Sequence, residues 1–212
     1  MTLVMRIESV KPEPDRNGRY WVSFNDGTRL GLYRQSIEDF GLFPGKELSA
    51  EEWESLQTHA GQMSAKMRAV RIVAAASVSK KDLQQRLVQK GETEHNAAQA
   101  VAWMEEMNLV DDAETARQVV SRCIAKGYGL QRAKQALYEK KIPKQYWDAA
   151  LADYPDQNEY ISSFLRSKLS DPSDPKLVKK VVDALLRRGH SYAQIRIGLR
   201  NLDMYEEELS EE

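Results

Sequence analysis

The stretch that decides the fold is LVDDAETARQVVSRCIAKGYGLQRAKQALYEKKIP, residues 109–143. Apolar residues of its first half recur at the spacing of one helical stripe: Ala116, Val119, Val120, Cys123 and Ile124. Gly127 and Gly129 end this helix, because glycine tolerates the left-handed conformation common at helix C-termini. A second helix begins at Leu130, and Pro143 opens a third, since proline suits a first helical turn. The stretch therefore predicts a three-helix unit.

The same unit is predicted to occur three times. Segments of the chain align without gaps at offsets of 50 and 62 residues. The matching positions are Val70, Val120 and Val182 in the first helix, Ser79, Gly129 and Ser191 at the turn, and Leu87, Leu137 and Leu199 in the second helix. This agreement indicates a degenerate tandem repeat.

The predicted fold is mainly α, with three tandem three-helix repeats in an elongated array. We assign residues 61–112 to the first repeat and 113–156 to the second. The third repeat takes residues 157–212, including a connecting helix over 158–169 and a short acidic tail. Residues 1–60 precede the repeats as a small α+β module.

The N-terminal module is predicted to hold a β-hairpin or three strands. The stretch RYWVSF (19–24) alternates apolar and polar residues, and Asp26-Gly27 is a strong signal for a tight hairpin turn. Ser49 followed by Glu52 predicts a capping box at the start of a helix. Such a module is too small to bury a large core by itself.

Composition favours a cytoplasmic protein. No apolar run approaches the roughly 20 residues of a membrane span, and the N-terminus lacks the apolar core of a signal peptide. The single cysteine, Cys123, lies on an apolar stripe and is interpreted as a core residue rather than a catalytic thiol. The net charge is −1 overall, but residues 61–204 carry +7, which permits contact with an anionic partner.

Catalytic and metal-binding patterns are missing from the sequence. There is no glycine-rich nucleotide loop, and His59, His95 and His190 are isolated and interpreted as surface or turn residues. Asp111 and Asp112 are adjacent carboxylates, which we interpret as helix caps rather than an acid–base pair. No nucleophile stands with a base. We expect a non-enzyme with no cofactor and no metal.

Binding is therefore predicted to use basic surfaces on the repeats. The candidate contact residues are Arg86, Lys90, Arg122, Lys126, Tyr128, Arg132, Lys134, Lys140, Lys141, Arg187, Arg188, Arg196 and Arg200. For Tyr128 two interpretations stay open: an accessible aromatic in a glycine turn, or a lid over the small residues of its own unit. A phosphate backbone or an acidic protein groove would suit these surfaces.

The central residues resemble the RecX family of recombination regulators. The matching positions are Leu109-x-Asp-Asp, Ala116, Arg122, Lys126-Gly-Tyr-Gly, Leu137 and Lys140-x-Ile142. The stretch Met5–Leu56 is similar to an extension found in some Gram-positive members. Three residues depart from the family pattern: Thr115 stands for a phenylalanine, Ala133 for a larger aliphatic residue and Lys141 for a glycine.

The resemblance implies three tandem three-helix repeats and a defined partner. That partner is the RecA recombinase, bound along the groove of its filament on single-stranded DNA, with inhibition of ATP hydrolysis and strand exchange. It implies a role in recombination, DNA repair and the SOS response, with the chain acting as a monomer that also touches the DNA phosphate backbone. The alternatives are a helix-turn-helix-like DNA-binding regulator and a helical-repeat scaffold for another protein.

Overall fold

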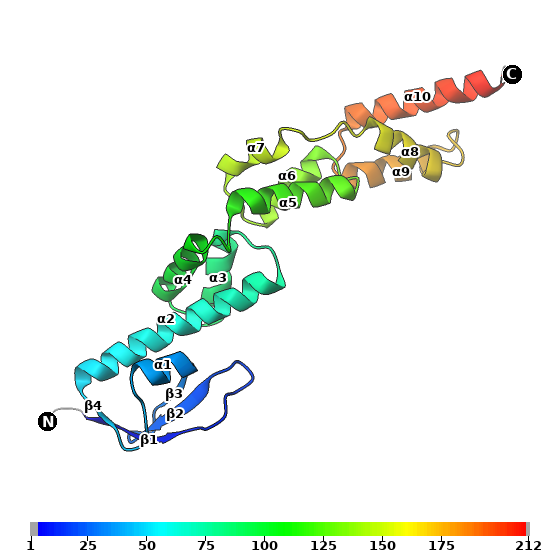
Figure 1. Cartoon of the computed structure of the whole chain (residues 1–212). Helices are drawn as coiled ribbons and strands as arrows, with labels where there is room; N and C mark the ends of the chain where they lie inside the picture. The colour runs from blue at the N-terminus through cyan, green and yellow to red at the C-terminus, as the bar shows by residue number, and fades with distance from the viewer. Residues whose placement is uncertain (1–3, 211–212) are drawn as a thin grey trace. The chain divides into compact units, whose positions relative to one another are not determined.

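The computed structural model describes the backbone of residues 4–210 and the side chains of residues 4–202. The chain is mainly helical, with a small antiparallel sheet near the N-terminus (Figure 1). It forms two compact units. The first holds the residues up to Ala76 together with Leu83–Val110, and the second holds Ser77–Asp82 together with the residues from Asp111 onward. The predicted fold class, mainly α with an N-terminal β module, is confirmed.

The sheet has four strands in the order β3-β2-β1-β4. The strands are Met5–Val10 (β1), Tyr20–Phe24 (β2), Arg29–Leu32 (β3) and Glu47–Leu48 (β4). Alternation along β2 buries Val22 and Phe24 completely, and Gly27 takes a φ of 84° in the predicted hairpin turn. The three-strand prediction missed β4, because two residues are too few to show an alternating pattern.

Helix α2 (Ala50–Ala75) follows α1 (Arg34–Asp39) and runs without a break across the boundary predicted at residue 60. The predicted capping box begins it: the Glu52 backbone N–H donates to Ser49 Oγ at 3.2 Å, and the Ser49 N–H donates to the Glu52 carboxylate at 2.8 Å. Leu56 packs into the core of the sheet. One helix therefore belongs to both the β module and the first helical cluster.

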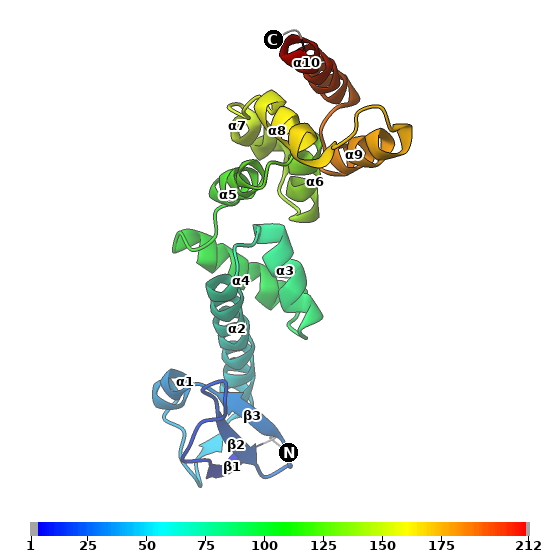
Figure 2. The same cartoon turned by 90° about the vertical axis from the view of Figure 1, so that its right-hand side faces the viewer.

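The first helical cluster is formed by α2, α3 (Lys80–Gln89) and α4 (Glu94–Glu106). Helices α2 and α4 pack closely on each other (Figure 2). Each contributes two fully buried alanines: Ala65 and Ala69 of α2, and Ala97 and Ala100 of α4. Val101 and Met104 of α4 are buried, whereas Met107 and Leu109 after the helix are about half exposed at 54% and 50%. Val110 is buried, at 4% exposed.

The central cluster is formed by α5 (Asp112–Ala125), α6 (Leu130–Glu139), a 3-10 turn (Lys144–Tyr146) and α7 (Trp147–Leu151). The α5 stripe predicted from the sequence packs on α6 and α7. Leu137 of α6 is fully buried in this core. The three helices expected in the deciding stretch are therefore present.

The last cluster corrects the predicted role of residues 158–169. These residues form α8 (Asn158–Lys168), which packs extensively on α10 (Tyr192–Ser210), while α9 (Pro175–Arg187) completes the core (Figure 1). The stretch is thus a full member of the cluster and not a connector. The predicted acidic tail continues α10 as far as residue 210, and residues 211–212 lie outside the described residues.

The predicted register of the third repeat is also wrong. A tight turn with positive φ follows each of α3, α6 and α9, at Gly91 (93°), Lys141 (56°) and Gly189 (87°). Such turns also follow α4 and α5, at Asn108 and Gly127. The packing decides the register: α2 packs on α4, α5 on α7 and α8 on α10, so α3, α6 and α9 are the corresponding middle helices. The step from the first cluster to the second is 50 residues, as the alignment gave, but the next step is 48 residues and not 62.

Candidate functional site

A basic cleft of about 450 Å³ lies in the first unit. Its lining includes five cations, Arg19, Arg68, Arg71, Arg86 and Lys90, and the polar residues Asn17 and Ser64. They come from the turn before β2, from the C-terminal half of α2 and from α3 with the turn after it. We call this set the basic cleft.

Arg68 of α2 is fixed by the turn that follows α3. Its Nη1 donates to the carbonyl oxygen of Lys90 at 2.6 Å, and its Nε lies 2.9 Å from Glu92 Oε1. The same Glu92 oxygen accepts a hydrogen bond from Ser64 Oγ at 2.9 Å. The Glu92 side chain is only 7% exposed, so the Arg68–Glu92 ion pair holds the Arg68 guanidinium in a fixed position at the cleft.

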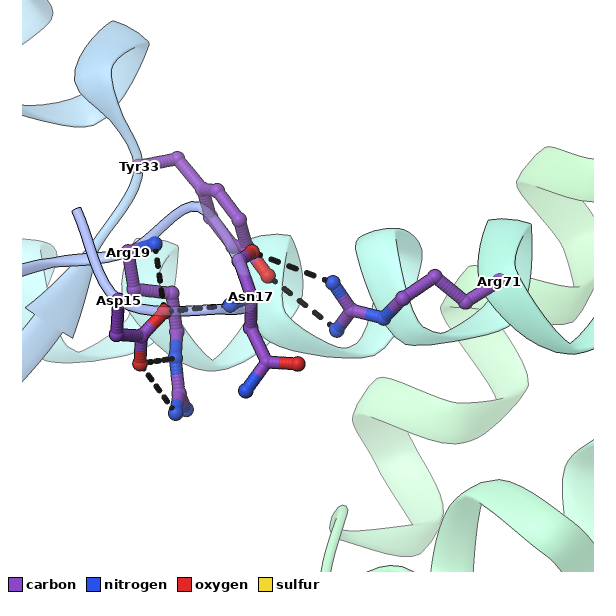
Figure 3. A network of polar contacts seen from close by, with 5 residues as sticks. All are labelled: Asp15, Asn17, Arg19, Tyr33 and Arg71. Atoms are coloured by element: carbon purple, nitrogen blue, oxygen red, sulfur yellow. Dashed lines mark hydrogen bonds and ion pairs between the residues drawn. The ribbon is translucent and has the colours of Figure 1, made fainter.

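Arg19, at the turn before β2, is held by Asp15 (Figure 3). The Asp15 carboxylate accepts hydrogen bonds from the Arg19 backbone N–H at 3.0 Å and from the guanidinium Nε and Nη2 at 3.0 and 2.9 Å. These bonds, the backbone one first, lower the pKa of Asp15 to about 2. The guanidinium also lies over the Trp21 ring, 5.2 Å from its centroid.

Arg71 differs from these two arginines because only neutral oxygens hold it. Nη1 donates to the Asn17 carbonyl oxygen at 3.4 Å, and Nη2 donates to the Tyr33 hydroxyl at 3.5 Å (Figure 3). Both distances are at the long limit for a hydrogen bond. Within the described residues no carboxylate lies at ion-pair distance from Arg71. Its guanidinium is thus presented to the cleft with little compensation of its charge.

Sequence reasoning identified two members of the basic cleft, Arg86 and Lys90, and missed the other three cations. Arg68 and Arg71 are three residues apart in a predicted helix, so their shared face was a usable signal. Arg19 could not be found in this way. It reaches α2 only through folding of the sheet against that helix, which has no local sequence pattern.

In the second unit, the segment before α3 contacts the turn after α6. Ser79 Oγ donates to the Lys140 carbonyl oxygen at 2.7 Å. Lys141 Nζ forms an ion pair of 2.8 Å with Asp82, whose side chain is 8% exposed. Lys140 and Lys141 therefore lie in a packing contact. There the ammonium group of Lys141 compensates the charge of the buried Asp82 carboxylate.

The two adjacent aspartates have different partners. Asp111 Oδ1 accepts hydrogen bonds from the Ala113 and Glu114 backbone N–H groups at 2.7 and 3.3 Å, so it caps α5 as predicted. Asp112 is 3% exposed and instead accepts the Lys80 backbone N–H at 2.8 Å. Asp112 thus accepts the backbone N–H of the first residue of α3 and does not cap its own helix. The cap interpretation is therefore right for Asp111 and wrong for Asp112.

A second contact joins the α5–α6 turn to the α9–α10 turn, and we call it the Gly129 contact. The Gly129 N–H donates to the Arg188 carbonyl oxygen at 2.9 Å. A Cβ at Gly129 would collide with the Gly189 carbonyl, and one at Gly127 would collide with the Tyr160 ring. Glycine is required here because two backbones touch.

Arg188 is enclosed by the Gly129 contact. Its guanidinium carbon lies 5.3, 5.5 and 5.7 Å from the ring centroids of Tyr128, Tyr160 and Phe164, and Nη2 donates to the Lys126 carbonyl oxygen at 2.7 Å. The half-buried Tyr128 ring thus contacts Arg188 of the last cluster, a partner that neither interpretation from the sequence included. Sequence reasoning missed Tyr160 and Phe164 as partners.

His190 lies in the turn between α9 and α10, one of the two predicted settings, but it is buried inside the Gly129 contact at 3% exposed. Its Nε2 is 3.1 Å from the Gly127 carbonyl oxygen, and its ring stacks on Tyr160 at 5.5 Å. Nδ1 is buried without a hydrogen-bond partner among the described residues. Burial, and to a smaller extent the charge of Arg188, lower the pKa of His190.

The other candidate cations lie at the surface of the second unit. Arg132 forms an ion pair of 3.0 Å with Glu139 of the same helix. The exposed candidates are Arg122, Lys126, Lys134, Arg187, Arg196 and Arg200. Cys123 is buried in the central cluster, and burial raises the pKa of its thiol. In the described part of the chain, no group of three His, Cys, Asp or Glu side chains could hold a metal ion.

Over the described residues, no helix is both long enough and apolar enough to cross a membrane.

Comparison with known proteins gives consistent likenesses. A family model described as the second three-helix domain of RecX matches residues 111–151, which correspond to α5–α7. The regulatory protein RecX of Clostridioides difficile (strain 630) is 24% identical over 98% of this chain and 99% of its own length. That of Cronobacter sakazakii is 31% identical over 64% of this chain and 90% of its own length.

Two solved structures share the fold. A crystal structure of regulatory protein RecX matches with a TM-score of 0.61 at 20% identity, over 91% of this chain and 97% of that chain. The crystal structure of RecX from Lactobacillus salivarius matches with a TM-score of 0.58 at 20% identity, over 68% of this chain and 97% of its own.

Proposed function

Because this chain belongs to the RecX family of regulatory proteins, we propose that it regulates the RecA recombinase without catalysing a reaction itself. It binds the RecA filament on single-stranded DNA as a monomer and inhibits ATP hydrolysis and strand exchange. The observation that carries this proposal is the full-length likeness to a curated regulatory protein RecX, which extends from the β module through the last cluster.

The surface of the second unit supports a binding role. Exposed cations lie on α5, α6, α9 and α10, including Arg122, Lys134 and Arg196. Several weak contacts from one chain act together as a strong one, because the later contacts form intramolecularly. Tandem clusters of this kind suit a partner that itself repeats along a filament.

Direct binding to the filament tests the proposal. Labelled chain is titrated with RecA filaments formed on single-stranded DNA with a non-hydrolysed ATP analogue, and fluorescence anisotropy is followed. We expect saturable binding to filaments. Equal binding to the bare DNA would instead favour the DNA-binding regulator, and binding to neither would contradict the proposal.

A charge-reversal pair locates the contact surface. Arg122→Glu with Lys134→Glu changes two exposed candidates of the central cluster and is expected to weaken filament binding, because opposed charges become like charges. The matched control is Arg166→Glu with Lys168→Glu, which makes the same charge change at exposed positions of α8, outside the candidate contact residues. Equal loss in both variants would show a general electrostatic effect rather than this surface.

A further inference from the structure

We propose that the basic cleft of the first unit is a binding site for adjacent phosphate groups, carried by a nucleoside di- or triphosphate or by a nucleic-acid backbone. The site lies outside the surfaces that support filament binding, and it gives the N-terminal module a role of its own. It stands on the geometry of the cleft and does not depend on the proposed function.

The charge of the cleft calls for an anionic ligand. Five cationic side chains line a volume of about 450 Å³. Asp15 and Glu92 form ion pairs with Arg19 and Arg68, whereas the hydrogen-bond partners of Arg71 are neutral oxygens. The lining itself contains no Asp or Glu. Like charges held this closely repel one another, and a bound anion converts that repulsion into attraction.

The same carboxylates also orient the cleft. Asp15 binds the Arg19 guanidinium through Nε and Nη2, and Glu92 with the Lys90 carbonyl oxygen fixes Arg68. Arginines whose forks are already positioned lose less freedom when they bind a ligand. The carboxylates occupy Nε and Nη2 of Arg19 and Nε of Arg68, so each guanidinium offers a phosphate its remaining N–H groups in charge-assisted hydrogen bonds.

Arg71 is the residue best placed to exchange its present contacts for a ligand. Its two hydrogen bonds, to the Asn17 carbonyl oxygen and the Tyr33 hydroxyl, are long and involve neutral acceptors (Figure 3). A phosphate oxygen offers a shorter, charge-assisted bond. Lys90, exposed at the turn after α3, adds a mobile point charge at the same cleft.

The size of the cleft agrees with this ligand class. Pockets that hold small ligands have volumes of roughly 300–1,000 Å³. A volume of about 450 Å³ is enough for two or three phosphate groups with part of a sugar. The polar Asn17 and Ser64 side chains in the lining provide neutral partners for the ester and hydroxyl oxygens.

Titration of the full chain tests the site. Isothermal titration calorimetry is run at low salt with pyrophosphate, with ATP, with a short oligothymidylate and with polyglutamate of matched charge. We expect saturable binding of at least one phosphate ligand. Binding of ATP and pyrophosphate identifies a free nucleotide as the source, whereas binding of the oligonucleotide alone identifies a nucleic-acid backbone.

Two variants and a control assign the binding to the cleft. Arg71→Met and Lys90→Met keep much of the side-chain volume and remove the charge, and each is expected to weaken binding by about tenfold. Arg29→Met removes an exposed cation of β3 outside the cleft and should leave binding unchanged. Circular dichroism confirms that each variant is folded.

Several outcomes would overturn the site. They are no saturable binding of any phosphate ligand, an equal effect of the cleft variants and of Arg29→Met, and polyglutamate binding at least as tight as that of the phosphates. RecA is absent from every arm, so failure of this site is distinguishable from failure of filament binding.

Discussion

Leu137 is the single residue on which the central cluster most depends. It is fully buried and packs among the apolar residues of α5 and the turn before α7. Leu137→Asp places an unpaired charge in that core, which is expected to lower the free energy of unfolding by about 3–5 kcal/mol. Urea denaturation followed by circular dichroism measures this loss.

The adjacent position provides the control for that variant. Tyr138 is 67% exposed, so Tyr138→Asp introduces the same charge at the surface and should change stability little. Wild-type stability of Leu137→Asp would show that the predicted stripe of α6 is wrong.

His190 makes the stability of the second unit depend on pH. Its pKa is lowered in the folded chain by burial, so above the unfolded value of about 6.5 both states are neutral and the residue has no effect. As the pH falls below 6.5, the unfolded state takes up the proton first, and stability decreases. The folded state resists protonation because Nδ1 is buried near Arg188 and has no acceptor among the described residues.

This effect is measured by thermal unfolding of wild type and His190→Gln at pH 7.5 and pH 5.5. Gln cannot titrate and can still donate a hydrogen bond toward the Gly127 carbonyl oxygen, so the variant should lose less stability on acidification than the wild type does. His95→Gln changes an exposed histidine and serves as control. Equal acid sensitivity of His190→Gln and wild type would contradict the account.

Single residues were predictable where their partners are near in sequence. The Ser49–Glu52 capping box and the Asp111 cap follow from spacings of two or three residues, and both are present. The burial of Asp112 and His190 was not predicted, because their hydrogen-bond partners, Lys80 and Gly127, are 32 and 63 positions away. No local pattern distinguishes a buried polar residue of this kind from an exposed one.

At the scale of elements, the Gly129 contact determines how the central cluster meets the last one. Gly129 has a φ of −76°, so alanine suits its backbone, and the cost comes from the added Cβ, which would collide with the Gly189 carbonyl and the His190 backbone nitrogen. Gly129→Ala is expected to destabilise the second unit by about 1–3 kcal/mol while the helices remain formed. Chemical denaturation gives the stability and circular dichroism the helix content.

Gln131→Ala, two residues further on and exposed, is the matched control. An unchanged unfolding midpoint for Gly129→Ala would show that the two turns are not in close contact.

The helices and the hairpin were largely predictable from the sequence. Which helix of one repeat matches which helix of the next was not. Apolar stripes of period 3.6 identified the helices, and the Asp26-Gly27 turn identified the hairpin. The same stripe fits any helix of a repeat, however, so α9 could be aligned with α5 although it corresponds to α6. The packing of α7 on α5 and of α10 on α8 reveals the register. Lys141 takes a positive φ after α6, and a lysine there does not mark the turn in the sequence as a glycine would.

At the scale of the whole molecule, the distribution of cationic side chains indicates an anionic partner. The net charge of −1 conceals a basic stretch over residues 61–204. Within the first unit, cations far apart in sequence gather in the basic cleft, and within the second they spread over helix surfaces. Composition predicted an anionic partner, but only the folded chain shows that Arg19, Arg68 and Arg71 join Arg86 and Lys90.

The central claim, that this chain restrains the RecA recombinase, is tested most directly by an ATPase titration. RecA filaments are formed on single-stranded DNA with ATP, and the rate of hydrolysis is followed as the chain is added. The account predicts a saturable decrease in the rate, and a weaker decrease with the Arg122→Glu, Lys134→Glu variant than with the Arg166→Glu, Lys168→Glu control. A hydrolysis rate that stays unchanged at saturating concentrations of the chain would contradict it.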